Sequence, residues 1–180
     1  MSRVISIEVS EHEGDTMEIE RKFLMTGFPE GLHEIEKALV HQAYITVDPE
    51  VRVRSMAYSD GSIDYIQTIK GNGNMIRTER ENPITEWEYN KEIKEIGLEP
   101  IEKEYRAYVL EDGNILEVSK VDNQFYYGEV EFKSEEQANK WRPSERVSRY
   151  IIKDITYASE YKMKNYWYRT RLEKEKPAKV

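Results

Sequence analysis

Charged side chains recur at every second position in several segments of this chain, and this alternation constrains the fold more than any other feature. Residues two apart share one face of a β-strand. Charges usually face water, but the opposite faces here hold few large aliphatic side chains and would fill a barrel poorly. We therefore predict that the charges line a wet interior and that the apolar faces point outward beneath helices. The alternating sets are Glu18/Glu20/Lys22, Arg52/Arg54, Arg77/Glu79/Glu81 and Glu129/Glu131.

Short segments separated by turn-forming residues are typical of antiparallel hairpins. Eight of them can close into a barrel around a small lumen. The predicted fold class is α+β, an eight-stranded antiparallel β-barrel that forms a tunnel with a charged lumen and peripheral helices. The predicted strands are 17–25, 42–47, 51–58, 63–70, 75–81, 101–110, 114–121 and 125–132.

Four helices are predicted around the strands. Residues 27–40 carry Leu32, Ile35 and Leu39 at helical spacing, with a proline near the start. The segment 85–96 begins at the capping residue Thr85 and ends before a glycine. Residues 134–141 open with a capping-box pattern, and 158–171 is the fourth candidate.

Length and composition favour one soluble domain. The 180 residues carry 27 Lys and Arg against 35 Asp and Glu, a net charge of −8, which argues against general binding to nucleic acid or an anionic membrane. Cysteine is absent, which excludes disulfides and thiolate chemistry. No apolar run approaches the ~20 residues that cross a bilayer, and no signal-peptide core is present. A cytoplasmic location follows as the expectation, and a homodimer is left open.

The predicted organisation is one tunnel domain with two short extensions. Residues 1–16 form an N-terminal arm or short strand, 17–172 form the domain, and 173–180 form a frayed tail of low complexity.

Cations and carboxylates together in one lumen suggest a particular ligand. Lysine and arginine in a cleft bind phosphate oxygens, arginine often through two hydrogen bonds. Clustered carboxylates hold Mg²⁺ or Mn²⁺ through oxygen. The charged lumen therefore predicts a site for a metal-bound polyphosphate.

Several motifs, in order, resemble those of the CYTH superfamily, which includes class IV adenylyl cyclases, thiamine triphosphatases and inorganic triphosphatases. The segment from Glu18 to Lys22 resembles the ExExK signature of that superfamily. Five later segments resemble its RxR, TxKG, RxExE, LEVD and EVEF strands, and the resemblance extends in register to Phe132. Those segments contain Arg52-Val-Arg54, Thr68-Ile-Lys70-Gly, Arg77-Thr-Glu79-Arg-Glu81, Leu116-Glu117-Val118 and Glu129-Val-Glu131-Phe.

The resemblance implies a role for each matched residue. Metal-side carboxylates would be Glu18, Glu20, Glu129 and Glu131. Phosphate would be held by Lys22, Arg52, Arg54, Lys70 and Arg77. The catalytic set would comprise Glu18, Glu20 and Lys22 together with Glu79 and Glu81, which would organise cations or metal-bound water.

Three positions depart from the family pattern. Ser119 stands where the family has Asp after LEV. The KxRY strand is matched imperfectly: Arg106 can be carried over as a phosphate ligand, but Glu104 replaces the Lys unless a bulge brings in Lys103. The closing Tyr/Lys/Asn segment is matched loosely near residue 162, where Lys162 is the candidate lid lysine.

The function that these observations favour is hydrolysis of a triphosphate with Mg²⁺ or Mn²⁺. Inorganic triphosphate is the first-choice substrate, ahead of ATP and thiamine triphosphate, because no base-recognition pocket is evident. One alternative is a class IV adenylyl cyclase that makes cyclic AMP and pyrophosphate from ATP. Another is a non-catalytic sensor of polyphosphate or nucleotide, to which the missing Asp at Ser119 gives weight.

Overall fold

A computed structural model describes residues 14–174 of the chain. Residues 1–13 and 175–180 lie outside the described part, and with them most of the expected N-terminal arm and tail. The strands are β1 (Thr16–Met25), β2 (His33–Val47), β3 (Glu50–Tyr58), β4 (Ile63–Lys70), β5 (Ile76–Pro83), β6 (Ile101–Val109), β7 (Ile115–Val121), β8 (Phe125–Glu131) and β9 (Ile151–Asp154). The helical elements are α2 (Glu86–Ile96), α3 (Glu135–Lys140), α4 (Glu145–Ser148), η1 (Ser159–Tyr161), α5 (Met163–Trp167) and η2 (Tyr168–Leu172).

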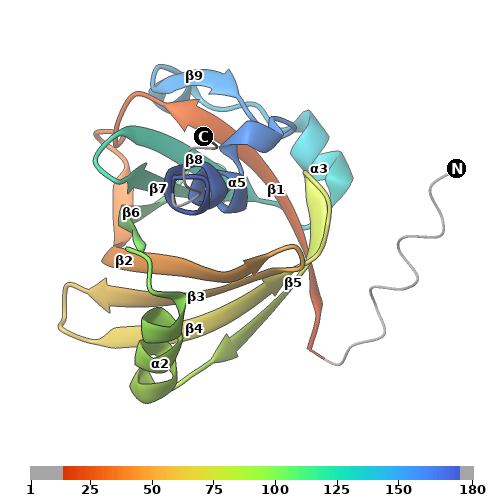
Figure 1. Ribbon diagram of the computed structural model, residues 1–180. Helices are drawn as coiled ribbons and strands as arrows, with labels where there is room; N and C mark the ends of the chain where they lie inside the picture. The colour runs from red at the N-terminus through yellow and green to blue at the C-terminus, as the bar shows by residue number, and fades with distance from the viewer. Residues whose placement is uncertain (1–13, 175–180) are drawn as a thin grey trace, which may run out of the picture.

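Eight antiparallel strands close into a barrel, as the short segments and turn signals predicted (Figure 1). They run in the order β5-β4-β3-β2-β6-β7-β8-β1, and β1 closes the ring by pairing with β5. The first half of β1 pairs with β5 (Met17 opposite Thr78), and the second half pairs with β8 (Lys22 opposite Glu129). The short strand β9 lies outside the ring and pairs with the end of β1.

The helix predicted at 27–40 is wrong, because the structure has β2 from His33 onward. Both edges of β2 find strand partners, the adjoining β3 on one side and the distant β6 on the other, and these ladders satisfy its backbone groups. The helical spacing that suggested a buried stripe was misleading. Ile35 and Leu39 remain 49% and 39% exposed, whereas Ala38 and Val40, two apart, are buried.

The helix predicted at 85–96 is confirmed in α2. The Thr85 side chain accepts a hydrogen bond from the Glu88 backbone N–H, the Glu88 side chain completes the capping box, and Gly97 ends the helix at φ 67°. The third predicted helix is α3, which stops at Lys140. The fourth, predicted as one helix over 158–171, is instead a 3₁₀ turn, a short α-helix and a π-helical segment in succession.

The main apolar core lies outside the barrel wall. Outward side chains of β1, β7 and β8 pack beneath α3 and α4, with Phe23 against Trp141 and Val130 fully buried. This arrangement leaves the inner faces of the same strands free for charged residues. This arrangement agrees with the prediction that charges line the interior and apolar faces point outward.

A second apolar cluster fills one end of the barrel. The C-terminal elements α5 and η2 lie across this end in Figure 1, and Trp167 is 1% exposed. Trp167 packs against Tyr44 at the end of β2, and the cluster includes Ile101 at the start of β6 and Val121 at the end of β7. The interior therefore has one closed end and an opposite end that we call the mouth.

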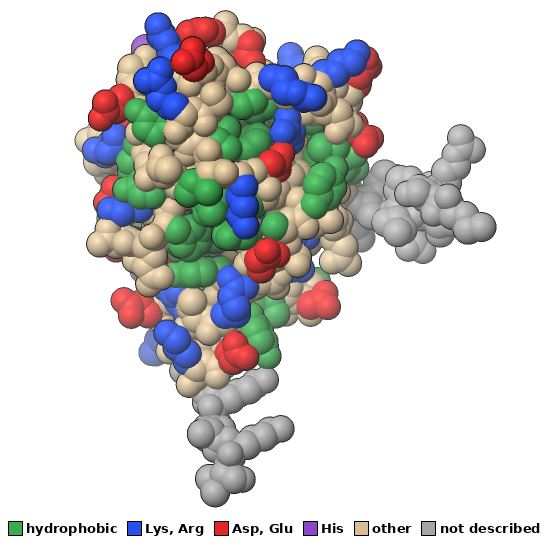
Figure 2. Space-filling model, turned by 90° about the horizontal axis from the view of Figure 1, so that it is seen from above, with side chains coloured by type: hydrophobic (Ala, Val, Ile, Leu, Met, Phe, Trp, Pro, Cys, Tyr) green, Lys and Arg blue, Asp and Glu red, His purple; other side chains and the backbone are tan. Residues whose placement is uncertain are grey.

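Acidic and basic side chains are interspersed on the face seen in Figure 2, with hydrophobic side chains between them. Among residues 14–174, no helix is long and apolar enough to cross a membrane.

Candidate active site

The barrel encloses a cavity of about 380 Å³. Charged side chains from β1, β3, β4, β5 and β8 line it because inward residues recur at period 2 along each strand. In the described part of the chain, seven Lys or Arg and nine Glu contribute to its wall. The sequence-predicted residues that line it are Glu18, Glu20, Lys22, Arg52, Arg54, Lys70, Arg77, Glu79, Glu81, Glu129, Glu131 and Lys162.

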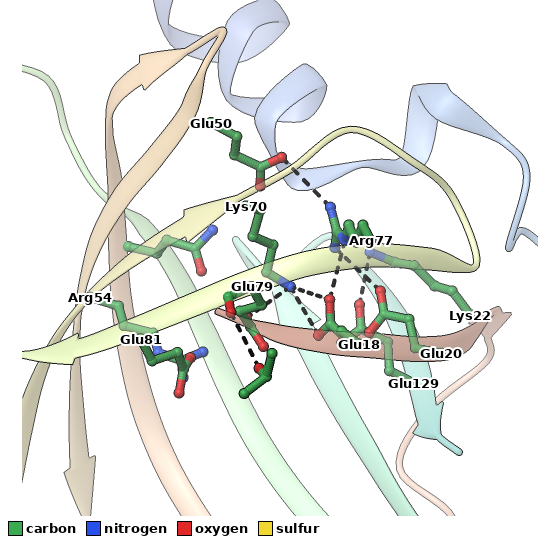
Figure 3. A network of polar contacts seen from close by, with 12 residues as sticks. Glu18, Glu20, Lys22, Glu50, Arg54, Lys70, Arg77, Glu79, Glu81 and Glu129 are labelled. Atoms are coloured by element: carbon green, nitrogen blue, oxygen red, sulfur yellow. Dashed lines mark hydrogen bonds and ion pairs between the residues drawn. The ribbon is translucent and has the colours of Figure 1, made fainter. Parts of the chain in front are cut away.

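Glu18 joins two of the predicted phosphate-binding cations. Its carboxylate lies 2.9 Å from Lys70 Nζ and 3.2 Å from Arg77 Nε, and Lys70 also lies 3.2 Å from Glu79 (Figure 3). Burial alone would raise the pKa of Glu18, but Lys70 and Arg77 outweigh burial and lower it. Glu18 is thus held as a carboxylate, and it orients two cations toward the lumen.

Glu20 and Glu129 crowd one another from neighbouring strands. Burial, together with repulsion from Glu129 and Glu18, raises the pKa of Glu20 to about 8. Burial would also raise the pKa of Glu129, but Lys22 and Lys70 outweigh it and lower the pKa to about 2. The raised pKa of Glu20 therefore records a repulsion among these carboxylates that a bound cation would relieve, and such shifts are common at functional sites.

Arg52 is a buried cation without a carboxylate partner. It is 8% exposed, and no Asp or Glu in residues 14–174 lies within ion-pair distance of it. The Tyr44 side chain is its hydrogen-bond partner, and its Nε atom has none. A buried guanidinium with free donors costs stability unless an anion satisfies it. Arg52 therefore points to an anionic ligand.

Lys103 belongs to the cavity, although the sequence prediction gave it only as a conditional alternative. Its Nζ donates to Gln42 Oε1 at 3.0 Å and to Tyr127 Oη at 2.9 Å, and the residue is 6% exposed. Burial and the nearby Arg52 guanidinium lower its pKa well below the usual value. The β6 register explains this placement without a bulge: Lys103 and Tyr105 point inward, so Glu104 points outward.

The same register carries Arg106 away from the cavity. Arg106 lies over the Phe28 ring at 4.1 Å and 3.6 Å from Glu34, outside the lumen. The structure therefore does not bring this predicted phosphate ligand to the site. At the other departures from the family pattern, Ser119 lines the cavity and is buried, and Lys162 donates to the Gly73 carbonyl beside the β4–β5 turn.

The chemistry of Glu18, Glu20, Glu129 and Glu131 suits a hard divalent cation. All the donors are carboxylate oxygens, and the raised pKa of Glu20 records a repulsion that a cation would relieve. Within residues 14–174, no three acidic or histidine side chains converge closely enough to hold an ion by themselves. Glu18, Glu20, Glu129 and Glu131 would hold it only with further oxygen ligands, such as those of a phosphate.

Comparison with known proteins adds to this geometry. No protein-family profile matches the chain. An inorganic triphosphatase from Nitrosomonas europaea is 28% identical over 149 residues, which cover 79% of this chain and 94% of that protein. The crystal structure of the inorganic triphosphatase NE1496 has a TM-score of 0.57 at 28% identity, covering 83% of this chain and 93% of that one. The PH1819 protein of Pyrococcus horikoshii has a TM-score of 0.52 at 18% identity over 68% of this chain and 82% of that one, a likeness of fold alone.

Proposed function

Because the chain has the CYTH-like triphosphate tunnel fold, we propose that it hydrolyses a triphosphate, with inorganic triphosphate as the first-choice substrate. The observation that carries this proposal is Arg52, a buried guanidinium with an unpartnered Nε that lines a cavity beside a carboxylate cluster. The 28% identity to an inorganic triphosphatase supports it. The proposed products are phosphate and pyrophosphate.

Phosphate oxygens would be bound by cations from several strands. Arg52 offers free donors at the closed end, and Lys103 lies at the same level of the barrel. Four other cations of the proposed set are already oriented by carboxylates, so they need little reorganisation when an anion arrives. These four are Lys22, Arg54, Lys70 and Arg77. The last member of the set, Lys162, is held by the Gly73 carbonyl.

Glu18, Glu20, Glu129 and Glu131 would hold Mg²⁺ or Mn²⁺ together with the phosphates. When bound, the metal would supply positive charge that balances the phosphate oxygens. The composition of the lumen gives a reason why a metal would be needed. Nine Glu outnumber seven Lys and Arg in the described part of its wall before any anion is bound. A polyphosphate would therefore enter more favourably with a cation than without one.

Hydrolysis needs no side-chain nucleophile in this arrangement. Glu79 and Glu81 line the lumen beside Lys70 and Arg54, and each can accept a hydrogen bond from a water molecule. We propose that they orient the water for in-line attack on a terminal phosphorus. The surrounding cations would stabilise the charge that develops on the departing pyrophosphate, since positioning and charge stabilisation are the main contributions in phosphoryl transfer.

A class IV adenylyl cyclase is the second candidate. Met56, Tyr58 and Tyr105 line the cavity toward its mouth and form a surface on which a nucleotide base could rest. A non-catalytic sensor is the third candidate, because Ser119 removes one carboxylate from the family pattern.

The three candidates are separated by one set of assays. Purified protein is incubated with inorganic triphosphate, ATP or thiamine triphosphate and with Mg²⁺ or Mn²⁺, and phosphate and cyclic AMP are measured together. Phosphate release from inorganic triphosphate is the expected result. Cyclic AMP from ATP would favour the cyclase, and tight binding without turnover would favour the sensor.

A further inference from the structure

The unpaired charges of the lumen are separated along the barrel axis. At the closed end, Arg52 and Lys103 have no carboxylate within ion-pair distance among residues 14–174. At the mouth the unpaired charges are negative. Glu36 and Glu117 line the cavity there, and neither has a Lys or Arg within ion-pair distance among residues 14–174. We call Glu36 and Glu117 the acidic rim.

Strand register places the rim far from the closed end. Glu36 is near the start of β2 and Glu117 near the start of β7, whereas Trp167 and its neighbours cover the other ends of these strands. Both rim side chains are exposed. The Tyr105 hydroxyl donates a hydrogen bond to Glu117 and fixes its carboxylate at the cavity wall.

The closed end determines which part of a ligand reaches the rim. A polyphosphate whose first phosphates contact Arg52 and Lys103 cannot pass through that end, because apolar side chains fill it. Any additional phosphate must extend toward the mouth, past Glu36 and Glu117. Each added phosphate brings further negative charge beside two carboxylates that have no Lys or Arg within ion-pair distance in residues 14–174. Like charges at short range disfavour binding.

We propose that the acidic rim selects inorganic triphosphate against longer polyphosphate chains. This inference rests on the proposed function, because it assigns the chain length accepted by the same cavity. Glu36 and Glu117 act as specificity residues: they touch no reacting atom, and they raise the free energy of complexes in which the anion extends beyond the mouth.

The experiment compares tripolyphosphate, tetrapolyphosphate and long-chain polyphosphate as substrates of the wild type and of Glu36→Gln, Glu117→Gln and the double variant. Glutamine keeps the shape of each side chain and can still accept the Tyr105 hydrogen bond. Glu104→Gln is the matched control, since Glu104 lies on neighbouring β6, is exposed and points away from the lumen. For each protein, the measured quantity is the kcat/KM for tetrapolyphosphate divided by that for tripolyphosphate.

In the double variant this ratio should rise roughly five- to tenfold at low ionic strength, and the gain should shrink as salt screens the rim. The control should keep the wild-type ratio. An unchanged ratio in the double variant, or an equal rise in Glu104→Gln, would overturn the inference.

Binding measured by calorimetry without divalent metal separates the two proposals. If the wild type does not hydrolyse tripolyphosphate, the proposed function fails, and the ratio of the two dissociation constants still tests the rim. If the wild type turns over tripolyphosphate but neither ratio responds to the double variant, only the rim inference fails.

Discussion

Lys22 and Glu129 face one another inside the barrel from the paired strands β1 and β8, with Nζ 3.1 Å from Oε1. Lys22 keeps Glu129 ionised despite its burial, so glutamine at this position removes a charge that is present at every pH of interest. We expect Glu129→Gln to lower kcat by on the order of 10²-fold or more, as for loss of one strong electrostatic contact in a transition state. Steady-state phosphate release measures this, with the exposed Glu135→Gln on α3 as control. Near-normal kinetics would remove Glu129 from the site.

Activity should depend on a divalent metal. Because acids outnumber bases in the lumen and carboxylates prefer hard cations, EDTA should abolish phosphate release and Mg²⁺ or Mn²⁺ should restore it. Full turnover after exhaustive chelation would contradict the proposed mechanism.

Arg52→Ala should affect binding at least as strongly as turnover. No Asp or Glu of residues 14–174 lies within ion-pair distance of Arg52, and its Nε atom has no hydrogen-bond partner there, so this donor is available to substrate in the ground state as well as in the transition state. We expect KM to rise by a factor no smaller than the fall in kcat. The matched control is Arg146→Ala, which alters an exposed arginine outside the cavity. A large fall in kcat with an unchanged KM would mean that Arg52 acts only in the transition state.

Arg54→Met should lose the stabilisation that ligand gives. In the empty protein Arg54 pairs with exposed Glu81 at 2.7 Å, and such a pair contributes little to stability, so the Tm of the unliganded variant should stay close to that of wild type. At 100 times Kd, triphosphate with Ca²⁺ should stabilise the wild type by about 2.7 kcal/mol, a rise in Tm of roughly 5–10 °C. Differential scanning fluorimetry measures both shifts. An equal shift in the variant would show that Arg54 does not contact the ligand.

Glu20 should make the empty protein less stable as the pH rises. Its pKa is raised from 4.5 to about 8 in the folded state, so between these values the folded protein binds more protons than the unfolded chain. The stability associated with protonated Glu20 is present below pH 4.5 and is lost as the pH rises through 8. Tm measured from pH 5 to 9 should therefore fall less steeply in Glu20→Gln than in wild type. Identical slopes would show that Glu20 titrates normally.

The inner lining of the barrel was largely predictable from the sequence, because the period of a strand is two and the charges themselves keep that period. Glu18, Glu20 and Lys22 remain on one face whatever β1 pairs with, and the structure places all three in the cavity. The capped helix α2 was predictable for a similar reason: Thr85 and Gly97 signal its ends within the local sequence.

Features set by distant partners were less predictable. Residues 33–40 have a helical spacing of apolar side chains, but β3 and β6 provide hydrogen-bond partners along both edges of β2. The pairing with the remote strand β6 is not visible in the local sequence. The register of β6 was equally hidden. It directs Lys103 into the lumen and Arg106 out of it, and only pairing with β7 and β2 decides between the two faces.

The packing of Trp167 into the end of the barrel also means that molecules enter and leave the interior through the mouth. If the proposed hydrolysis takes place, the product nearer the mouth can leave first. The product bound by the cations around Arg52 can leave only after it. Release of that inner product would then set how soon the next substrate molecule can bind.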